Sequence, residues 1–136
     1  MIVNFGVNYL AVIVAAVVAL VIGFAFYSPR TLGTRWMASL GTSQAQLGNP
    51  GPAGMATGIV ASLVNAWVLA VLATNLGATK ISDGMMLGVL CWLGFMATIT
   101  AAQIAFEKRP WSLWILNNMH NLIVQIVMAA IVTVWR

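Results

Sequence analysis

The stretch Val7–Tyr27, VNYLAVIVAAVVALVIGFAFY, is the part of the sequence that determines the fold class. It carries no charged residue, and as an α-helix its 21 residues extend about 31 Å, at about 1.5 Å per residue. The hydrocarbon core of a bilayer is about 30 Å thick. Because backbone groups in lipid must satisfy their own hydrogen bonds, a run of this length predicts a membrane-spanning helix over 7–27.

Three further uncharged apolar runs follow, at 52–75, 84–106 and 111–135. Of all 136 residues, 62% are hydrophobic and only 6% are charged, whereas an ordinary soluble domain carries about a quarter charged residues. The sequence therefore predicts a single all-α integral membrane domain over residues 1–136, with four spans and the lipid bilayer as its main contact. It excludes a water-soluble monomer, a disordered tail and a typical nucleic-acid-binding module.

The segment 28–51 is the longest connection between the predicted spans. Ser28 before Pro29 ends the first span, because proline disfavours helix in the residue that precedes it. Residues 31–40 mix basic, aromatic and apolar side chains in a way typical of a short amphipathic helix at the membrane interface. The last connection, 107–110, is so short that the third and fourth spans must form an antiparallel hairpin.

The basic residues predict an orientation. Four spans place both termini on one side of the membrane and segments 28–51 and 107–110 on the other. The side of these two segments carries Arg30, Arg35, Lys108 and Arg109, and the side of the termini carries Lys80 and Arg136. Because cytoplasmic loops are enriched in Lys and Arg, we expect both segments inside and both termini outside in a bacterial inner membrane.

Small residues recur at every fourth position of the second predicted span and at the start of the third. These positions are Gly54, Gly58, Ser62, Ala66, Ala70 and Thr74, followed by Gly84 and Gly88. Such faces let a second helix approach closely in lipid, where little hydrophobic force drives association. The partner helix belongs either to the same chain or to another copy. We expect a homo-oligomer, with a two-fold dimer as the default.

The fourth predicted span carries the most informative polar cluster. Its members are Asn117, Asn118, His120, Asn121 and Gln125. At 100° per residue they share one arc of about 160°, and this arc must face protein or water because polar groups are costly against hydrocarbon. Expected partners on the second and third spans are Asn65, Thr98, Thr100 and Gln103. Three interpretations stay open: hydrogen-bond contacts between helices, a path for a small solute or ion, or a binding pocket.

The remaining reactive residue types argue against an enzyme. Asp83 and Glu107 are the only acids and lie on opposite sides of the predicted membrane, so they cannot form a catalytic carboxylate pair. No nucleotide-binding loop, Ser-His-Asp set or zinc signature is present, and we predict no metal site. His120, the only histidine, could ligate haem or a chlorophyll-type pigment, but we expect an interior hydrogen-bonded residue and no cofactor.

Several short motifs together point to a family. They are Asn8-Tyr9-Leu10-Ala11-Val12, the stretch from Gly23 that ends in Tyr27-Ser28-Pro29, Leu32-Gly33-x-x-Trp36-Met37, Trp92-Leu93-Gly94-Phe95 and Glu107-x-Arg109-Pro110. With these motifs the chain resembles the bacterial membrane family called domain of unknown function 1761 over most of its length. The resemblance implies a four-span bacterial membrane protein and transfers no activity. It makes five residues candidates for shared structure at the inner interface: Tyr27, Pro29, Trp36, Glu107 and Arg109.

We therefore expect a small, non-enzymatic, oligomeric membrane protein whose polar face on the fourth span serves permeation of a small solute or ion. Two alternatives stay open. One is an accessory or scaffold subunit that binds the helices of a membrane-protein partner. The other is a cofactor-binding protein centred on His120.

Overall fold

The computed structural model describes residues 1–136, and all of its regular elements are helices. In chain order they are α1 Tyr9–Phe26, α2 Gly33–Leu40, α3 Gln44–Leu47, α4 Gly51–Asn75, α5 Ile81–Trp92, η1 Leu93–Ala97, α6 Thr98–Glu107 and α7 Trp111–Val134. Four helical rods are long and apolar enough to span a membrane, with α5, η1 and α6 joined into one of them. These rods confirm the predicted four-span, all-α fold class.

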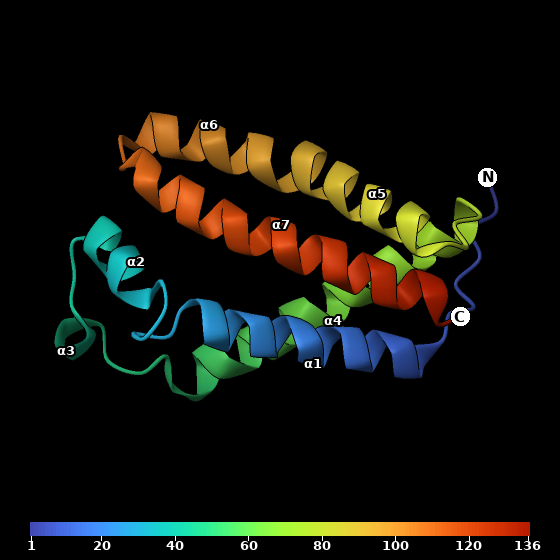
Figure 1. The fold of residues 1–136 in the computed structure, drawn as a ribbon, viewed down its shortest axis with the longest axis horizontal. Coiled ribbons are helices and arrows are strands. Elements are labelled where there is room, and N and C mark those ends of the chain that lie inside the picture. Colours follow the sequence, from blue (N-terminus) through green and yellow to red (C-terminus); the bar gives the residue numbers. More distant parts are fainter.

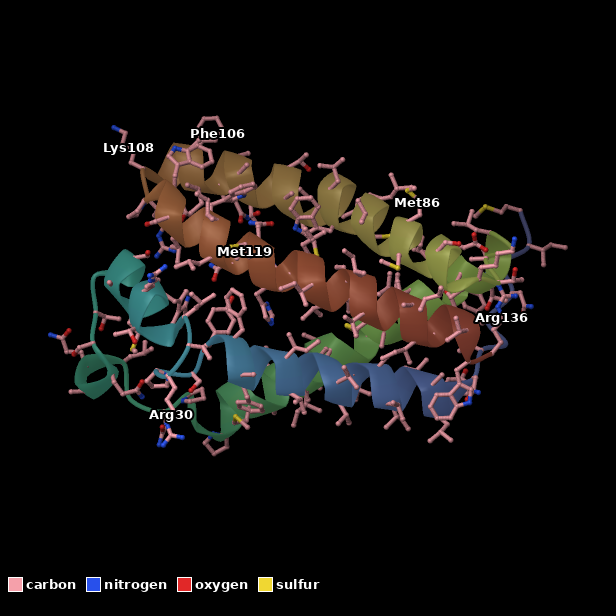
Figure 2. The ribbon with its side chains drawn as sticks, in the orientation of Figure 1. Arg30, Met86, Phe106, Lys108, Met119 and Arg136 are labelled. Atoms are coloured by element: carbon pink, nitrogen blue, oxygen red, sulfur yellow. The ribbon has the colours of Figure 1, made fainter.

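The bundle has two distinct ends. Both termini lie at one of them, and α2, α3 and the turn between α6 and α7 lie at the other (Figure 1). We call these the terminal end and the loop end. Arg30 and Lys108 lie at the loop end and Arg136 at the terminal end, with the apolar helices between them (Figure 2). This separation is the charge distribution that a lipid-embedded bundle requires.

Side-chain caps move two helix starts away from the predicted span limits. α1 begins after Asn8, whose Oδ1 accepts from the backbone N–H groups of Leu10 and Ala11 at 3.0 and 3.2 Å. α5 begins at Ile81, so the predicted start at residue 84 is corrected by three residues. Asp83 Oδ2 accepts from the backbone N–H groups of Thr79 and Lys80, both at 3.0 Å, so this acid caps the helix from within its first turn.

The segment after α1 turns sharply and packs back on the bundle. Thr31 Oγ1 donates to the carbonyls of Phe26 and Ser28, at 2.9 and 3.1 Å, which satisfies the end of α1. Where the sequence indicates a helix over 31–40, the structure has α2, followed by the single turn α3. α2 starts so close to α1 that a Cβ atom on Gly33 would overlap the carbonyl oxygen of Tyr27. A glycine is therefore required at this position.

α7 is the central helix of the bundle. It packs against α1 and α4, against α5 and α6, and against α2 at the loop end. Figure 1 shows it between α1 and the rod formed by α5 and α6. The closest approach is to α5, where a Cβ on Gly84 would lie 2.7 Å from the Ala129 carbonyl oxygen and one on Gly88 2.5 Å from that of Gln125. The small face at the start of the third span therefore has its partner within the chain.

The small-residue ridge of the second span is divided between two environments. Ala66 and Ala70 are buried in the core, with exposed fractions of 0% and 4%. Gly54 is exposed, and a Cβ on Gly58 would meet no atom within 4 Å. Ser62, between these halves, is half-buried. Only the half of the ridge nearer the terminal end is used for packing inside the chain.

Candidate functional site

The third rod changes its hydrogen-bond register in the segment η1, a π-helical turn that the sequence analysis does not anticipate. Around this turn, Trp92 Nε1 donates to Asn118 Oδ1 at 3.2 Å, and Trp114 Nε1 donates to the carbonyl oxygen of Ala97 at 3.2 Å. The two indoles thus satisfy a side-chain and a backbone acceptor inside the membrane region. Such turns are frequent at functional sites in helical proteins.

Asn118 is the hydrogen-bond centre between α7 and the third rod. Its Nδ2 donates to Thr100 Oγ1 at 3.0 Å and to the carbonyl of Trp114 at 3.1 Å, while its Oδ1 accepts from Trp92. Its side chain is 3% exposed, and every polar atom has a partner. Asn118 therefore has a structural role, as the interpretation of the polar arc as interhelical contact predicts.

Gln125 lies one to two turns further along α7. Its Nε2 donates to Asn65 Oδ1 at 3.2 Å and lies 3.0 Å from the sulfur of Met96. Gln125 is 4% exposed, and its Oε1 has no hydrogen-bond partner. This pair links α4, α7 and η1 in the middle of the bundle.

His120 points toward the end of α1. Its ring packs on Phe26 and Tyr27, with centroid separations of 5.5 and 5.0 Å. Nδ1 lies 3.2 Å from Asn121 Oδ1, and Nε2 is buried without a partner beside Gly23. Because the Asn121 oxygen is an acceptor, the proton is on Nδ1 and Nε2 carries the lone pair.

A polar cavity of about 270 Å³ lies at the loop end between α6, α7 and the end of α1. Its lining is Tyr27, Thr100, Gln103, Ile104, Glu107, Arg109, Leu113, Trp114, Asn117, Asn118 and Asn121. At about 30 Å³ per molecule of liquid water, this volume corresponds to about nine waters. The cavity brings three of the five predicted polar residues of the fourth span together with Gln103.

Tyr27 and the α6–α7 turn form the rim of this cavity. Tyr27 Oη donates to Asn117 Oδ1 at 2.9 Å, which ties the end of α1 to α7. Arg109 Nε lies 3.3 Å from Glu107 Oε2, and the two side chains are 54% and 55% exposed. Gln103 is exposed and makes no side-chain hydrogen bond within the chain, so it is free to meet a solute at the rim.

The other two residues of the predicted inner-interface motif lie outside the cavity. Trp36 packs edge-on against Tyr27, with ring centroids 5.1 Å apart, and so supports the rim from α2. Pro29 is exposed, and its carbonyl accepts from Thr34 Oγ1 at 2.9 Å. Thr98, an expected partner of the polar arc, instead donates to the carbonyl of Gly94 in its own rod at 3.0 Å.

Two residues of the site lie outside the sequence-based selection. Trp114 lines the cavity and is half-buried. Its spacing of three, four and seven residues from Asn117, Asn118 and Asn121 puts it on their helix face, a signal that was available. For Met96 the sequence carries no such signal, because its position depends on the register change in η1.

Fold and site together define a class: a small membrane protein with four spanning helices and a polar cavity at one end of the bundle. The chain belongs to the family described as protein of unknown function DUF1761, whose family model matches residues 10–133. This match confirms the family that the sequence motifs indicate. No curated protein and no solved structure matches the chain.

Proposed function

We propose that this protein is a non-enzymatic bacterial inner-membrane protein that lets a small polar solute cross the bilayer, with the polar cavity as its cytoplasmic entrance. The single observation that supports this most directly is a polar cavity built from amide side chains of membrane-spanning helices. Polar residues inside a membrane are costly, and they commonly mark solute and ion pathways. The excess of Lys and Arg at the loop end supports a cytoplasmic location for the cavity mouth.

The route beyond the cavity follows α7 toward the Gln125–Asn65 pair. In the present conformation Asn118 lies in the cavity lining with its side chain held by Trp92 Nε1, Thr100 Oγ1 and the backbone carbonyl of Trp114. In this proposal, passage requires the Asn118 side chain to release these hydrogen bonds. A gated path of this kind fits a slow, selective permeation protein better than an open pore.

Cysteine accessibility tests the proposal. In a Cys91→Ala background, Asn117→Cys and Asn121→Cys are expected to react with a membrane-impermeant thiol reagent added from the loop side. Met119→Cys is the matched control, because Met119 lies at the same depth and is 46% exposed on the outer surface of α7 (Figure 2). Equal protection of all three cysteines would contradict a water-filled cavity, and labelling without solute flux in proteoliposomes would contradict permeation.

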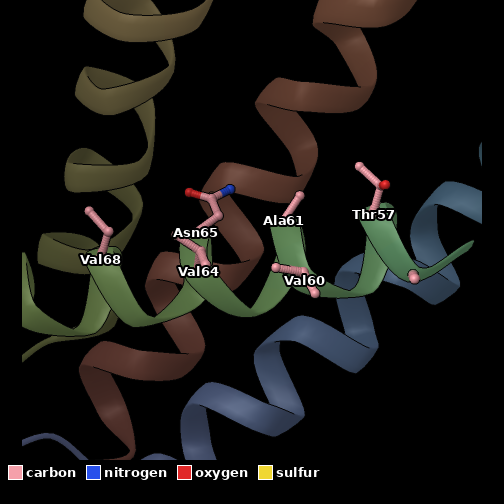
Figure 3. A pocket seen from close by; sticks show the side chains of 7 residues that line it. Thr57, Val60, Ala61, Val64, Asn65 and Val68 are labelled. Carbon is pink, nitrogen blue, oxygen red and sulfur yellow. The ribbon is translucent and has the colours of Figure 1, made fainter. Parts of the chain in front are cut away.

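A second candidate function, an accessory or scaffold subunit, is favoured by the outer face of α4. A shallow groove of about 760 Å³ runs along it, lined by Ala56, Thr57, Val60, Ala61, Val64, Asn65 and Val68. Figure 3 shows these side chains along one stretch of α4. In a Cys91→Ala background, the variant Ala61→Cys tests whether this face of α4 binds a second copy of the chain or a different protein. A disulfide-linked homodimer supports self-association, and a stoichiometric second protein in native mass spectrometry supports a scaffold.

The remaining alternative, a cofactor at His120, has weaker support. Nε2 is the only ring nitrogen left to bind a metal, and a Cβ on Gly23 would already lie 3.4 Å from it. The rings of Phe26 and Tyr27 occupy the adjacent space. We propose that no cofactor is bound there. A visible spectrum of the purified protein tests this proposal, since a haem or pigment band would contradict it.

A further inference from the structure

The polar cavity offers hydrogen-bond donors in excess where α7 lines it, and we infer that it binds the oxygen-bearing anionic head of its ligand, a carboxylate or a phosphate-type oxyanion. This inference rests on the proposed function, because it names the ligand class of the same cavity. It follows from which polar atoms of the lining are already paired within the chain and which are free.

Each of the two half-buried asparagines of the lining already uses one lone pair of its side-chain oxygen within the chain. Asn117 Oδ1 accepts from Tyr27 Oη at 2.9 Å, and Asn121 Oδ1 pairs with His120 Nδ1 at 3.2 Å. Neither Nδ2 group makes a hydrogen bond within the chain, so each amide offers two N–H donors to the cavity. Asn118 offers nothing, since all of its polar atoms are paired. The part of the wall that Asn117 and Asn121 form is therefore a surface rich in donors.

The rim adds a guanidinium group to this donor surface. Arg109 contacts Glu107 through Nε, at 3.3 Å, and its guanidinium makes no hydrogen bond to any other residue of the chain. A guanidinium presents its donors in a planar fork that suits carboxylate and phosphate oxygens. Glu107 is the only acid of the lining and lies at the exposed rim, where Arg109 balances its charge. Away from the rim no carboxylate lines the cavity, so a cation would find only neutral oxygens there and no negative charge.

The charge of the loop end favours the same ligand. It carries four basic residues, Arg30, Arg35, Lys108 and Arg109, against the single acid Glu107. The terminal end carries two basic residues against one acid: Lys80 and Arg136 against Asp83. An excess of positive charge around a cleft raises the local concentration of anions. The anion is thus attracted to the end at which the donors lie.

The size of the cavity restricts the ligand to a small head group. Pockets for drug-sized ligands have volumes of about 300–1,000 Å³, and this cavity, at about 270 Å³, falls just below that range. A metabolite-sized carboxylate fits, and so does the phosphate head of a lipid whose chains remain in the bilayer. Both sources present the same chemistry to the two asparagines and Arg109.

Three probes of nearly equal shape test the inference: acetate, acetamide and the acetamidinium cation. Binding to the purified protein in lipid-free detergent is followed through the change in tryptophan fluorescence, to which Trp114 in the cavity lining contributes. Because a hydrogen bond to a charged group contributes about 1.5–3 kcal/mol and 1.4 kcal/mol is a factor of ten, acetate should bind at least about tenfold more tightly than acetamidinium. Equal affinity, or a preference for acetamidinium, would overturn the inference.

Variants that add a negative charge to the cavity wall make the test more specific. Asn117→Asp and Asn121→Asp replace a donor by a carboxylate of nearly the same shape, so acetate affinity should fall at least about tenfold. Gln44→Glu is the matched control, because it adds the same charge on exposed α3 at the loop end and away from the cavity. If the control weakens acetate binding as much as the Asp variants do, general electrostatics accounts for the effect and the cavity assignment is wrong.

A further experiment with added lipid distinguishes a lipid head group from a free solute as the source of the anion. Micelles doped with phosphatidylglycerol should weaken acetate binding if a lipid head occupies the cavity and leave it unchanged if the ligand is a free solute. Failure of this inference is distinguishable from failure of the proposed function. If the cavity cysteines are labelled and solute flux occurs without a preference for anions, the permeation proposal holds and the anion inference is wrong. If anions bind but no flux occurs, the anion inference holds and the permeation proposal is wrong.

Discussion

The replacement Gly88→Ala probes the close contact between the membrane-spanning helices α5 and α7. The added Cβ would lie 2.5 Å from the Gln125 carbonyl oxygen, whereas ordinary van der Waals contact begins near 3.4 Å. α5 and α7 would have to separate by the missing distance, about 0.9 Å. A gap of about 0.5–1 Å forfeits a quarter to a half of the dispersion attraction of the atoms that line it. Because the opposing atom is backbone, no rotamer change relieves the overlap.

The expected cost follows from two opposing contributions. Overpacking of this kind destabilises by about 1–3 kcal/mol, and replacement of a helical glycine by alanine returns up to about 1 kcal/mol. We therefore expect Gly88→Ala to lower the free energy of unfolding by up to about 2 kcal/mol. Titration of the purified protein from mild detergent into sodium dodecyl sulfate, followed by circular dichroism, measures this change.

Gly58→Ala is the matched control, because it is the same replacement on a membrane-spanning helix where a Cβ meets no atom within 4 Å. At this position only the higher helix propensity of alanine contributes, so we expect the free energy of unfolding to rise by at most about 1 kcal/mol. Equal stability of the two variants would refute the packing derived for Gly88. A loss of stability in Gly58→Ala that depends on protein concentration would instead place a second copy against α4.

Three further predictions concern the loop end and the interhelical contacts. Asn118→Leu leaves the buried indole N–H of Trp92 without an acceptor, so we expect a loss of about 1–3 kcal/mol in the same unfolding assay. Gly33→Ala presses a Cβ against the carbonyl of Tyr27 and should displace α2, which tryptophan fluorescence detects as a red-shifted emission of the cavity rim. Glu107→Gln removes an exposed ion pair, so its stability should change by less than about 1 kcal/mol. Acetate binding, measured by fluorescence titration, should strengthen in the same variant.

The membrane spans could be predicted from the sequence because their signal is cumulative. Each is an uncharged run long enough to cross a bilayer, and no other structure satisfies the backbone over that distance. The start of α5 could not be placed from charge alone. Asp83 reads as a residue outside the span, yet its carboxylate belongs to the first helical turn as a cap. Charge marks the membrane boundary, and capping marks the helix boundary.

The division of the polar arc could not be predicted from helix geometry. A helical-wheel projection places Asn117, Asn118, Asn121 and Gln125 on one face of the helix. In the bundle, however, α7 has neighbouring helices on more than one side. Asn118 meets the third rod, Gln125 meets α4, and Asn117 meets the end of α1. Which amide pairs with which helix depends on the η1 register and on crossing angles, neither of which is encoded in spacing along one helix.

The pairing of amide donors distinguishes structure from function along α7. Buried N–H groups without an acceptor are rare in proteins, and unpaired carbonyl oxygens are more easily tolerated. Accordingly, the donors of Asn118 and Gln125 are paired, and the only deep amide atom without a partner is an oxygen, Gln125 Oε1. The free donors of Asn117 and Asn121 would break this rule if the cavity were dry. Water or a ligand in the cavity must therefore accept hydrogen bonds from these two Nδ2 groups. A dry cavity would leave both groups unpaired, and the cost of burying unpaired donors argues against that arrangement.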